Sequence, residues 1–94
     1  MKKVVLVTGG FDPLHSGHIA YFRAAKELGD YLIVGINSDD WLARKKDRAF
    51  MNWNERATIV KNLEVVNYVI EFDDSDDSAR NAIEIVKSTW RDYE

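Results

Sequence analysis

Apolar and polar positions alternate along the chain in blocks that predict strands and helices in turn. The run Val4–Val7 is continuous, apolar and mostly β-branched, as in strands that a parallel sheet buries on both faces. Apolar residues then recur at three-residue spacing over 17–28, which predicts a helix, and Gly29 lies where that helix should stop. A second strand of the buried type is predicted at Tyr31–Ile36. The whole unit spans about 33 residues, which suits one right-handed βαβ crossover.

The rest of the chain continues this alternation. The expected elements are a loop with a short helical piece over 40–52, a helix from 54 to about 63, a strand over 65–72, an acidic loop over 73–78 and a helix over 79–90. Asn54 and Ser78 are the expected N-caps of the two helices. The acidic loop is interpreted as a solvated segment. The order predicts an α/β fold, a Rossmann-like parallel sheet flanked by helices and truncated after about three strands, with ligands at the carboxyl ends of the strands.

Composition narrows the possible functions. The 94 residues fit a single domain. With 13 basic and 16 acidic residues, the net charge of −3 argues against broad binding of nucleic acid, although a few placed cations can still hold a small phosphate. The absence of cysteine excludes disulfides and thiolate catalysis. The apolar run near the N-terminus is too short for a signal peptide or a membrane span, so we expect a cytoplasmic protein that does not enter a membrane.

The first strand-to-helix turn concentrates the candidate chemistry. Gly9 and Gly10 permit a tight turn with unusual backbone angles and let a ligand approach the backbone. His15 and His18 stand at i and i+3, so both imidazoles project from one side of the helix start, where the helix dipole favours an anion. Gly17 places no side chain between them, so a phosphate could reach both rings.

Taken singly, each of these features is common. A histidine pair at this spacing is usually incidental, a Gly-Gly pair is usually a plain turn, and two histidines without a third ligand do not make a metal site. Together, in a βα turn, they suit attack on an α-phosphate, because that reaction is catalysed mainly by positioning and by hydrogen-bond donors to the phosphate oxygens.

The residues T-G-G-F-D-P-L-H-S-G-H at 8–18 resemble the signature of the cytidylyltransferase-like nucleotidyltransferases. The stretches 28–39, 54–60 and 64–70 extend the similarity, which is to glycerol-3-phosphate cytidylyltransferases and still more to the adenylyltransferase domain of ADP-heptose synthesis enzymes. The resemblance implies transfer of CMP or AMP from CTP or ATP to a phosphorylated polyol, sugar or amino-alcohol, with release of pyrophosphate. It also implies Mg²⁺ accompanying the triphosphate, and a homodimer.

The resemblance assigns roles to particular residues. It implies catalytic roles for His15, His18 and Lys45, with Lys46 as the second choice for the lysine that neutralises phosphate charge. The residues that it implies for nucleotide binding are Gly9, Gly10, Phe11, Asp12, Gly17, Lys46 and Arg56.

The end of the chain departs from the family pattern. Relatives continue with a further strand, a G-G-D-like turn and an I-S-[ST]-[ST] segment that holds the β- and γ-phosphates, and nothing here matches them. We therefore expect residues 1–94 to form a single nucleotidyltransferase-like domain that is the N-terminal part of a longer one. Two alternatives stay open: a truncated module that binds a nucleotide or phosphate without turnover, and an assembly piece whose exposed sheet edge pairs with another copy.

Overall fold

The computed structural model describes residues 2–90, so Met1 and residues 91–94 lie outside the description. The elements are β1 (Val4–Gly9), α1 (Ser16–Lys26), β2 (Tyr31–Ile36), α2 (Asp39–Lys46), α3 (Trp53–Lys61), β3 (Tyr68–Glu71) and α4 (Arg80–Thr89). The predicted order of strands and helices is confirmed.

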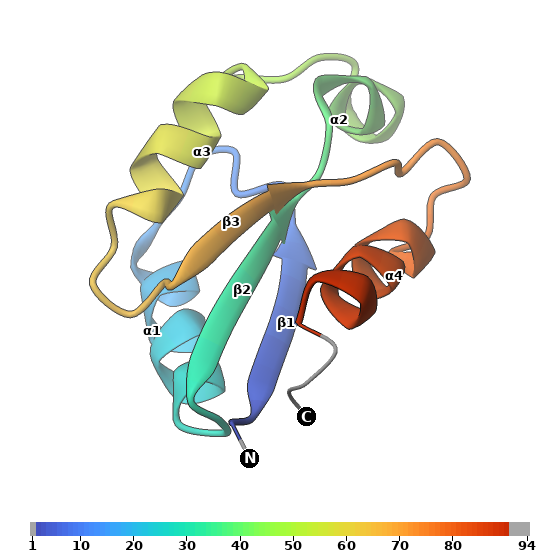
Figure 1. Cartoon of the computed structure of the whole chain (residues 1–94). Coiled ribbons are helices and arrows are strands. Elements are labelled where there is room, and N and C mark those ends of the chain that lie inside the picture. The colour runs from blue at the N-terminus through green and yellow to red at the C-terminus, as the bar shows by residue number, and fades with distance from the viewer. Residues whose placement is uncertain (1, 91–94) are drawn as a thin grey trace.

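The three strands form one parallel sheet in the order β1-β2-β3. Val34 of β2 pairs with Val7 on one side and with Val69 on the other. Helices α1 and α3 lie on one side of the sheet and α4 lies on the other, as Figure 1 shows. The predicted fold class, a Rossmann-like parallel sheet flanked by helices, is therefore confirmed.

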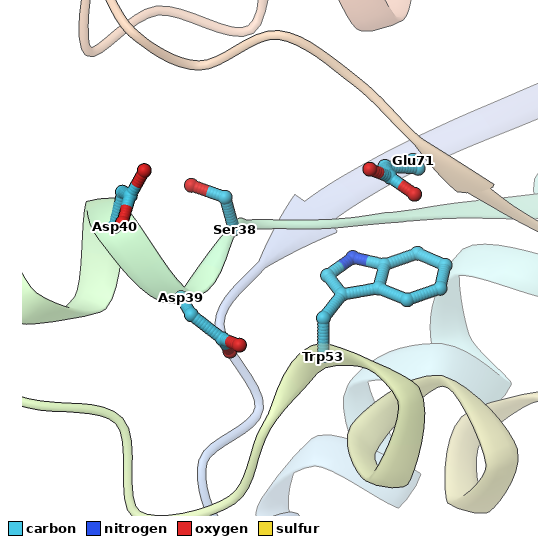
Figure 2. Close-up of a pocket in the computed structure, with 5 residues that line it drawn as sticks. All are labelled: Ser38, Asp39, Asp40, Trp53 and Glu71. Carbon is cyan, nitrogen blue, oxygen red and sulfur yellow. The ribbon is translucent and has the colours of Figure 1, made fainter.

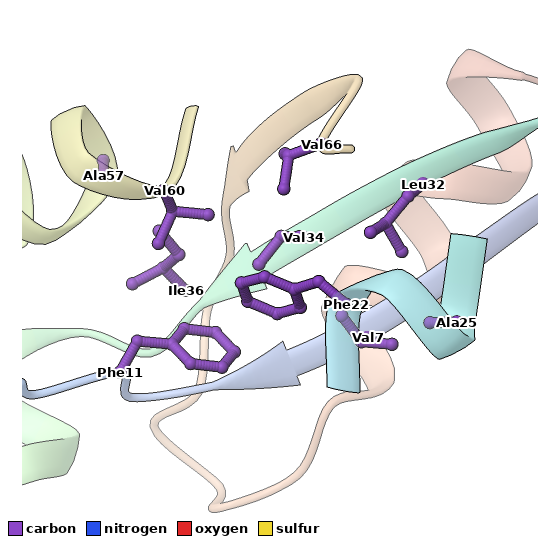
Figure 3. Packing of buried hydrophobic residues seen from close by; sticks show 10 residues of the cluster. All are labelled: Val7, Phe11, Phe22, Ala25, Leu32, Val34, Ile36, Ala57, Val60 and Val66. Carbon is purple, nitrogen blue, oxygen red and sulfur yellow. The ribbon is translucent and has the colours of Figure 1, made fainter. Parts of the chain in front are cut away.

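The main core lies between the sheet and helices α1 and α3 (Figure 3). Because successive side chains of a strand point to opposite faces, Val34 and Ile36 both reach this core. They are completely buried, as are Phe22 of α1 and Val60 of α3. Burial of this apolar surface is the main force that fixes α1 and α3 on the sheet.

The opposite face of the sheet is covered by α4. Ala82 is the fully buried residue of this helix, and α4 packs against β1. Trp90 follows the helix, and its ring centroid lies 5.2 Å from that of Tyr68. Ile83 of the same helix is 46% exposed.

Several predicted boundaries are wrong by a few residues. The N-cap of α3 is Asn52, whose Oδ1 accepts the N–H of Glu55 at 2.9 Å, so Asn54 lies inside the helix. Strand β3 is shorter than the predicted 65–72, because the N–H of Val66 closes a turn on the carbonyl of Leu63. The N-cap of α4 is Ala79 rather than Ser78. The Ser78 Oγ still accepts the N–H of Arg80, at 3.3 Å.

The turn after α1 also differs from the expectation. The helix is capped by Glu27, and Gly29 does not adopt a left-handed conformation. A Cβ atom at Gly29 would lie 2.8 Å from the carbonyl oxygen of Lys3, so this glycine permits a close approach between two backbone segments. Among residues 2–90, none of the helices is long and apolar enough to span a membrane.

Candidate functional site

The turn between β1 and α1 lies at the carboxyl edge of the sheet. Gly9 and Gly10 both have negative φ, so the expectation of unusual glycine angles is wrong, and Phe11 adopts the left-handed φ of 51° instead. The glycines are needed for space. A Cβ atom would lie 2.8 Å from Cζ of Phe11 if built on Gly9, and 2.8 Å from Cδ2 of Leu42 if built on Gly10. The turn is therefore packed tightly against its own phenyl ring and against α2.

The start of α1 is capped by the two histidines. His15 is the N-cap residue, and its Nδ1 accepts the N–H of Gly17 at 3.1 Å. The Nδ1 atom of His18, at the third helical position, accepts the N–H of His15 at 3.1 Å. This reciprocal arrangement is a capping box in which both side chains are imidazoles. The rings stack with their centroids 3.8 Å apart.

This capping fixes which nitrogen of each ring can serve a ligand. A neutral imidazole has one N–H donor and one acceptor nitrogen. Because Nδ1 of His15 and of His18 is the acceptor, the neutral ring carries its hydrogen on Nε2 in both cases. Burial and the neighbouring His15 lower the pKa of His18 from its ordinary value of 6.5, which favours this neutral form. The helix start thus offers two Nε2–H donors, while the Gly17 N–H is already bonded to the His15 ring.

Phe11 and Gly17 hold the two rings in place. The Phe11 ring is buried and meets the His18 ring edge-on, with the centroids 5.2 Å apart. A Cβ atom at Gly17 would lie 2.9 Å from Cε1 of His15. Gly17 therefore makes room for the His15 ring itself, and the expectation that a phosphate reaches both rings stays a prediction.

Asp12 ties the turn to the segment between α2 and α3. Its two carboxylate oxygens accept the backbone N–H groups of Phe50 and Met51, and Lys46 Nζ lies 2.9 Å from Oδ2. The Asp12 side chain is 1% exposed. Burial acts to raise the pKa of Asp12, but the hydrogen bonds from Lys46, Phe50 and Met51 outweigh it and hold the pKa below 3.8. Asp12 is thus a charged anchor of the turn, and its contact with a nucleotide stays a prediction.

The two candidate lysines on α2 have different surroundings. Lys46 reaches the turn, donating to the Asp12 carbonyl oxygen at 2.7 Å in addition to its carboxylate contact. Lys45 lies over the ring of Trp41, with its Nζ 5.5 Å from the ring centroid. The structure therefore brings Lys46 to the turn, whereas the contact recorded for Lys45 is with an aromatic ring. The catalytic role of Lys45 stays a prediction.

Arg56 is completely buried beneath the site. Its guanidinium donates to the carbonyl oxygens of Met51, Gly10 and Asn37 at 2.7–2.9 Å and to Asp39 Oδ1 at 2.6 Å. These four acceptors come from three separate segments of the chain, because Asn37 and Asp39 are two positions apart. Arg56 therefore holds the turn, the end of β2 and the starts of α2 and α3 together, and its contact with a nucleotide stays a prediction.

A pocket of about 280 Å³ opens at the carboxyl ends of β2 and β3. Its lining residues are Ser38, Asp39 and Asp40 at the start of α2, Trp53 at the start of α3 and Glu71 at the end of β3, as Figure 2 shows. The indole N–H of Trp53 donates to the carbonyl oxygen of Ile36 at 3.0 Å, which fixes the ring at the pocket wall. Parallel α/β sheets bind their ligands at this edge.

Sequence reasoning missed one buried acid. Asp74 was expected in a solvated loop, but it is 4% exposed and accepts hydrogen bonds from Asn37 and Ser38. Burial acts to raise its pKa, and the bonds from Asn37 and Ser38 lower it below 3.8. The place of the acidic loop after a strand puts it at the edge where the carboxyl ends of neighbouring parallel strands meet, but it does not single out Asp74. Within residues 2–90, no group of three or more His, Asp or Glu side chains is arranged to hold a metal ion.

The parallel sheet with helices on both faces (Figure 1) defines an α/β domain of the Rossmann-like type. The Cytidylyltransferase-like family model matches residues 6–90, and the chain belongs to this family.

Individual relatives agree with this placement. The bifunctional protein HldE of a Nitratiruptor species is 46% identical over 88 residues, which are 92% of this chain and 19% of that protein. The bifunctional protein HldE of Campylobacter concisus is 43% identical over 92% of this chain and 18% of its own length. This chain thus spans about a fifth of the length of the curated relatives it matches.

A solved structure shows the same fold. The lipopolysaccharide core biosynthesis protein from Thermoplasma volcanium superposes with a TM-score of 0.81 and 32% sequence identity, covering 90% of this chain and 69% of that one.

Proposed function

We propose that this chain binds a nucleoside triphosphate, ATP or CTP, and transfers its nucleotidyl group to a sugar phosphate. The acceptor phosphate oxygen attacks the α-phosphorus, a new P–O bond forms, the bond from the α-phosphorus to the bridging oxygen breaks, and pyrophosphate leaves. The observation that carries the proposal is the pair of Nε2–H donors at the start of α1. The resemblance to ADP-heptose synthesis enzymes supports a sugar phosphate as the acceptor.

The histidines would act by hydrogen bonding rather than by proton transfer. In phosphoryl transfer the developing charge spreads over the equatorial oxygens, and positioned donors stabilise it. The His15 and His18 rings would supply such donors through Nε2, because their capping bonds occupy Nδ1 and fix the rings in advance. Lys46 and Lys45 on α2 would add positive charge near the phosphates.

Mg²⁺ is proposed to arrive with the triphosphate. Asp12 is the acid within the turn, and its carboxylate already binds Lys46 and two backbone N–H groups. A metal held mainly by phosphate oxygens and water needs no carboxylate cage from the protein. The residues present therefore fit a metal that the nucleotide carries, which would neutralise charge on the phosphates.

The test is pyrophosphate release from ATP or CTP with Mg²⁺ and a panel of sugar phosphates. His15→Asn is the informative variant, because asparagine is a strong N-cap and keeps the helix start while it removes the imidazole. We expect the rate to fall at least about a hundredfold, as for loss of a donor to a transition-state oxyanion. Arg23→Ala, which removes an exposed cation from the same helix, should change it little.

The outcomes separate the candidate functions. Nucleotide binding without pyrophosphate release from any pair would favour the binding module without turnover. Release that His15→Asn leaves unchanged would contradict the role proposed for the histidine.

A further inference from the structure

Helix α2 carries both candidate lysines but has little apolar anchorage. It has eight residues, and Leu42 is its one buried side chain. Helices this short are not stable on their own in water, so tertiary contacts must hold it. Those contacts are largely polar: Arg56 holds Asp39, the turn holds Lys46, and the acidic loop 73–78 adds two further groups of contacts.

The first group of contacts fixes the N-terminus of α2. Asp74 Oδ2 accepts the Ser38 N–H at 2.8 Å and Asn37 Nδ2 at 3.0 Å, and Asp74 Oδ1 accepts the Ser38 hydroxyl at 2.7 Å. The same Ser38 hydroxyl oxygen caps the helix by accepting the N–H of Trp41 at 3.0 Å. The Asp74 carboxylate therefore orients the residue that begins α2.

The second group fixes the other end of the helix. Arg44 donates to the Asp74 carbonyl oxygen at 2.8 Å and to Asp77 Oδ1 at 2.9 and 3.2 Å. The side chains of Arg44 and Asp77 are 40% and 50% exposed, and ion pairs on the surface contribute little to stability. Asp74 is buried, so of the two acids it makes the stronger contribution from this loop.

The opposite side of α2 faces the turn between β1 and α1. Lys46 binds the carbonyl oxygen and the carboxylate of Asp12, two positions after Gly10. Leu42 Cδ2 stands against Gly10. The helix is therefore held between the acidic loop on one side and the turn on the other, so displacement at the loop would move the lysines at the turn.

From these contacts we infer that Asp74 is a positioning residue: it clamps α2, through Ser38 and together with Arg44, so that the lysines of this helix face the phosphates. The clamp itself stands on geometry alone, and its consequence for phosphates rests on the proposed function. Asp74 touches no reacting atom in this account.

The experiment is backbone amide hydrogen exchange on the full chain. In Asp74→Ala, exchange of the amides from Leu42 to Lys46 should be at least about tenfold faster, the factor that losing charge-assisted hydrogen bonds implies, while amides of β2 stay within about twofold. Asp74→Asn, which keeps one acceptor oxygen, should give a smaller effect, and so should Arg44→Ala. If exchange is too fast to time, the ¹³Cα shifts of the same residues report the loss of helix.

Asp76→Ala is the matched control. It removes the same charge from the same loop, but the hydrogen bonds of the Asp76 carboxylate go to Ser78 inside the loop. Unchanged α2 exchange in Asp74→Ala, or an equal effect of Asp76→Ala, would overturn the clamp.

A titration with ATP and CTP tests the positioning role separately. If the wild-type chain binds either one, its Kd should rise about tenfold in Asp74→Ala and stay unchanged in Asp76→Ala. If Asp74→Ala speeds exchange in α2 but leaves the Kd unchanged, the positioning role is overturned. Absence of nucleotide binding by the wild type would contradict the proposed function and leave the exchange result to decide the clamp.

Discussion

The Nδ1 atom of His18 accepts the backbone N–H of His15, and the Nδ1 atom of His15 in turn caps the helix that carries His18. A proton added to either Nδ1 would turn an acceptor into a donor and break a cap. The two rings that would meet the phosphates are thus the same groups that hold the helix start.

The first prediction concerns pH. The pKa of His18 is lowered from 6.5, so the stability gained from neutral His18 is fully present above that pH and is lost as the pH falls below it. Replacing His18 by Gln keeps an acceptor at the third helical position, as capping boxes require, but removes the titration. Urea unfolding between about pH 7.5 and 5.5 should show a steeper loss of unfolding free energy in the wild type than in His18→Gln. Parallel pH profiles would contradict the preference of the folded protein for neutral His18.

The second prediction separates stability from binding at Gly17. Alanine in a helix is favoured over glycine by about 1 kcal/mol, and displacing the His15 cap costs about as much, so Gly17→Ala should change the free energy of unfolding little. The added Cβ would press on the His15 ring from 2.9 Å and displace it, so affinity for nucleotide should fall. Calorimetry with ATP and CTP measures this effect. Ser16→Ala, one residue earlier at an exposed position, is the control and should bind as the wild type does.

The third prediction concerns the buried guanidinium. Arg56→Lys retains the charge but cannot reach four separated acceptors, because an ammonium lacks the planar fork of donors. We expect a loss of about 3–5 kcal/mol in the free energy of unfolding, the cost of breaking a buried charged network. Chemical denaturation measures it. The control is Arg48→Lys at an exposed position, which should leave the free energy of unfolding almost unchanged. A similarly small loss in Arg56→Lys would argue against the structural role of Arg56.

The fourth prediction distinguishes the two lysines. Lys46→Met leaves the buried Asp12 carboxylate without its cation, so it should lower both stability and nucleotide affinity. Lys45→Met removes a cation that lies over the Trp41 ring and pairs with no buried acid in the part of the chain that the structure describes, so it should change stability little. It should still lower nucleotide affinity, because it removes positive charge near the phosphates. Thermal unfolding with and without ATP measures both quantities. If Lys45→Met leaves the affinity unchanged, Lys46 alone supplies the charge at the turn.

The sequence supported the fold well because its signals are local and repeated. Continuous apolar runs mark β1 and β2, and three-residue periodicity marks α1, so the element order followed directly. Boundaries were less certain because Asn52 and Asn54 are equally good caps by residue type. Packing against the sheet decides between them.

The site could be predicted where its residues lie in one turn, and less well where it depends on contacts with residues distant in the sequence. His15 and His18 are adjacent on one helix, and their spacing alone brings them together. The space that Gly10 leaves is filled by Leu42, a residue from another element. The buried state of Asp74 likewise depends on Asn37 and Ser38, some 36 positions earlier in the chain. Nothing in the run of acids near Asp74 distinguishes it from its exposed neighbours.

Arg56 also bears on how this protein unfolds. Its donors join carbonyl oxygens at Gly10, Asn37 and Met51, so the turn, the end of β2 and the segment before α3 cannot separate without exposing a buried charge. Subglobal opening of the turn alone is therefore costly, and the turn and the sheet core should form one cooperative unit. A protease should consequently reach the turn only when the whole domain opens, and any ligand held there would slow cleavage throughout the chain.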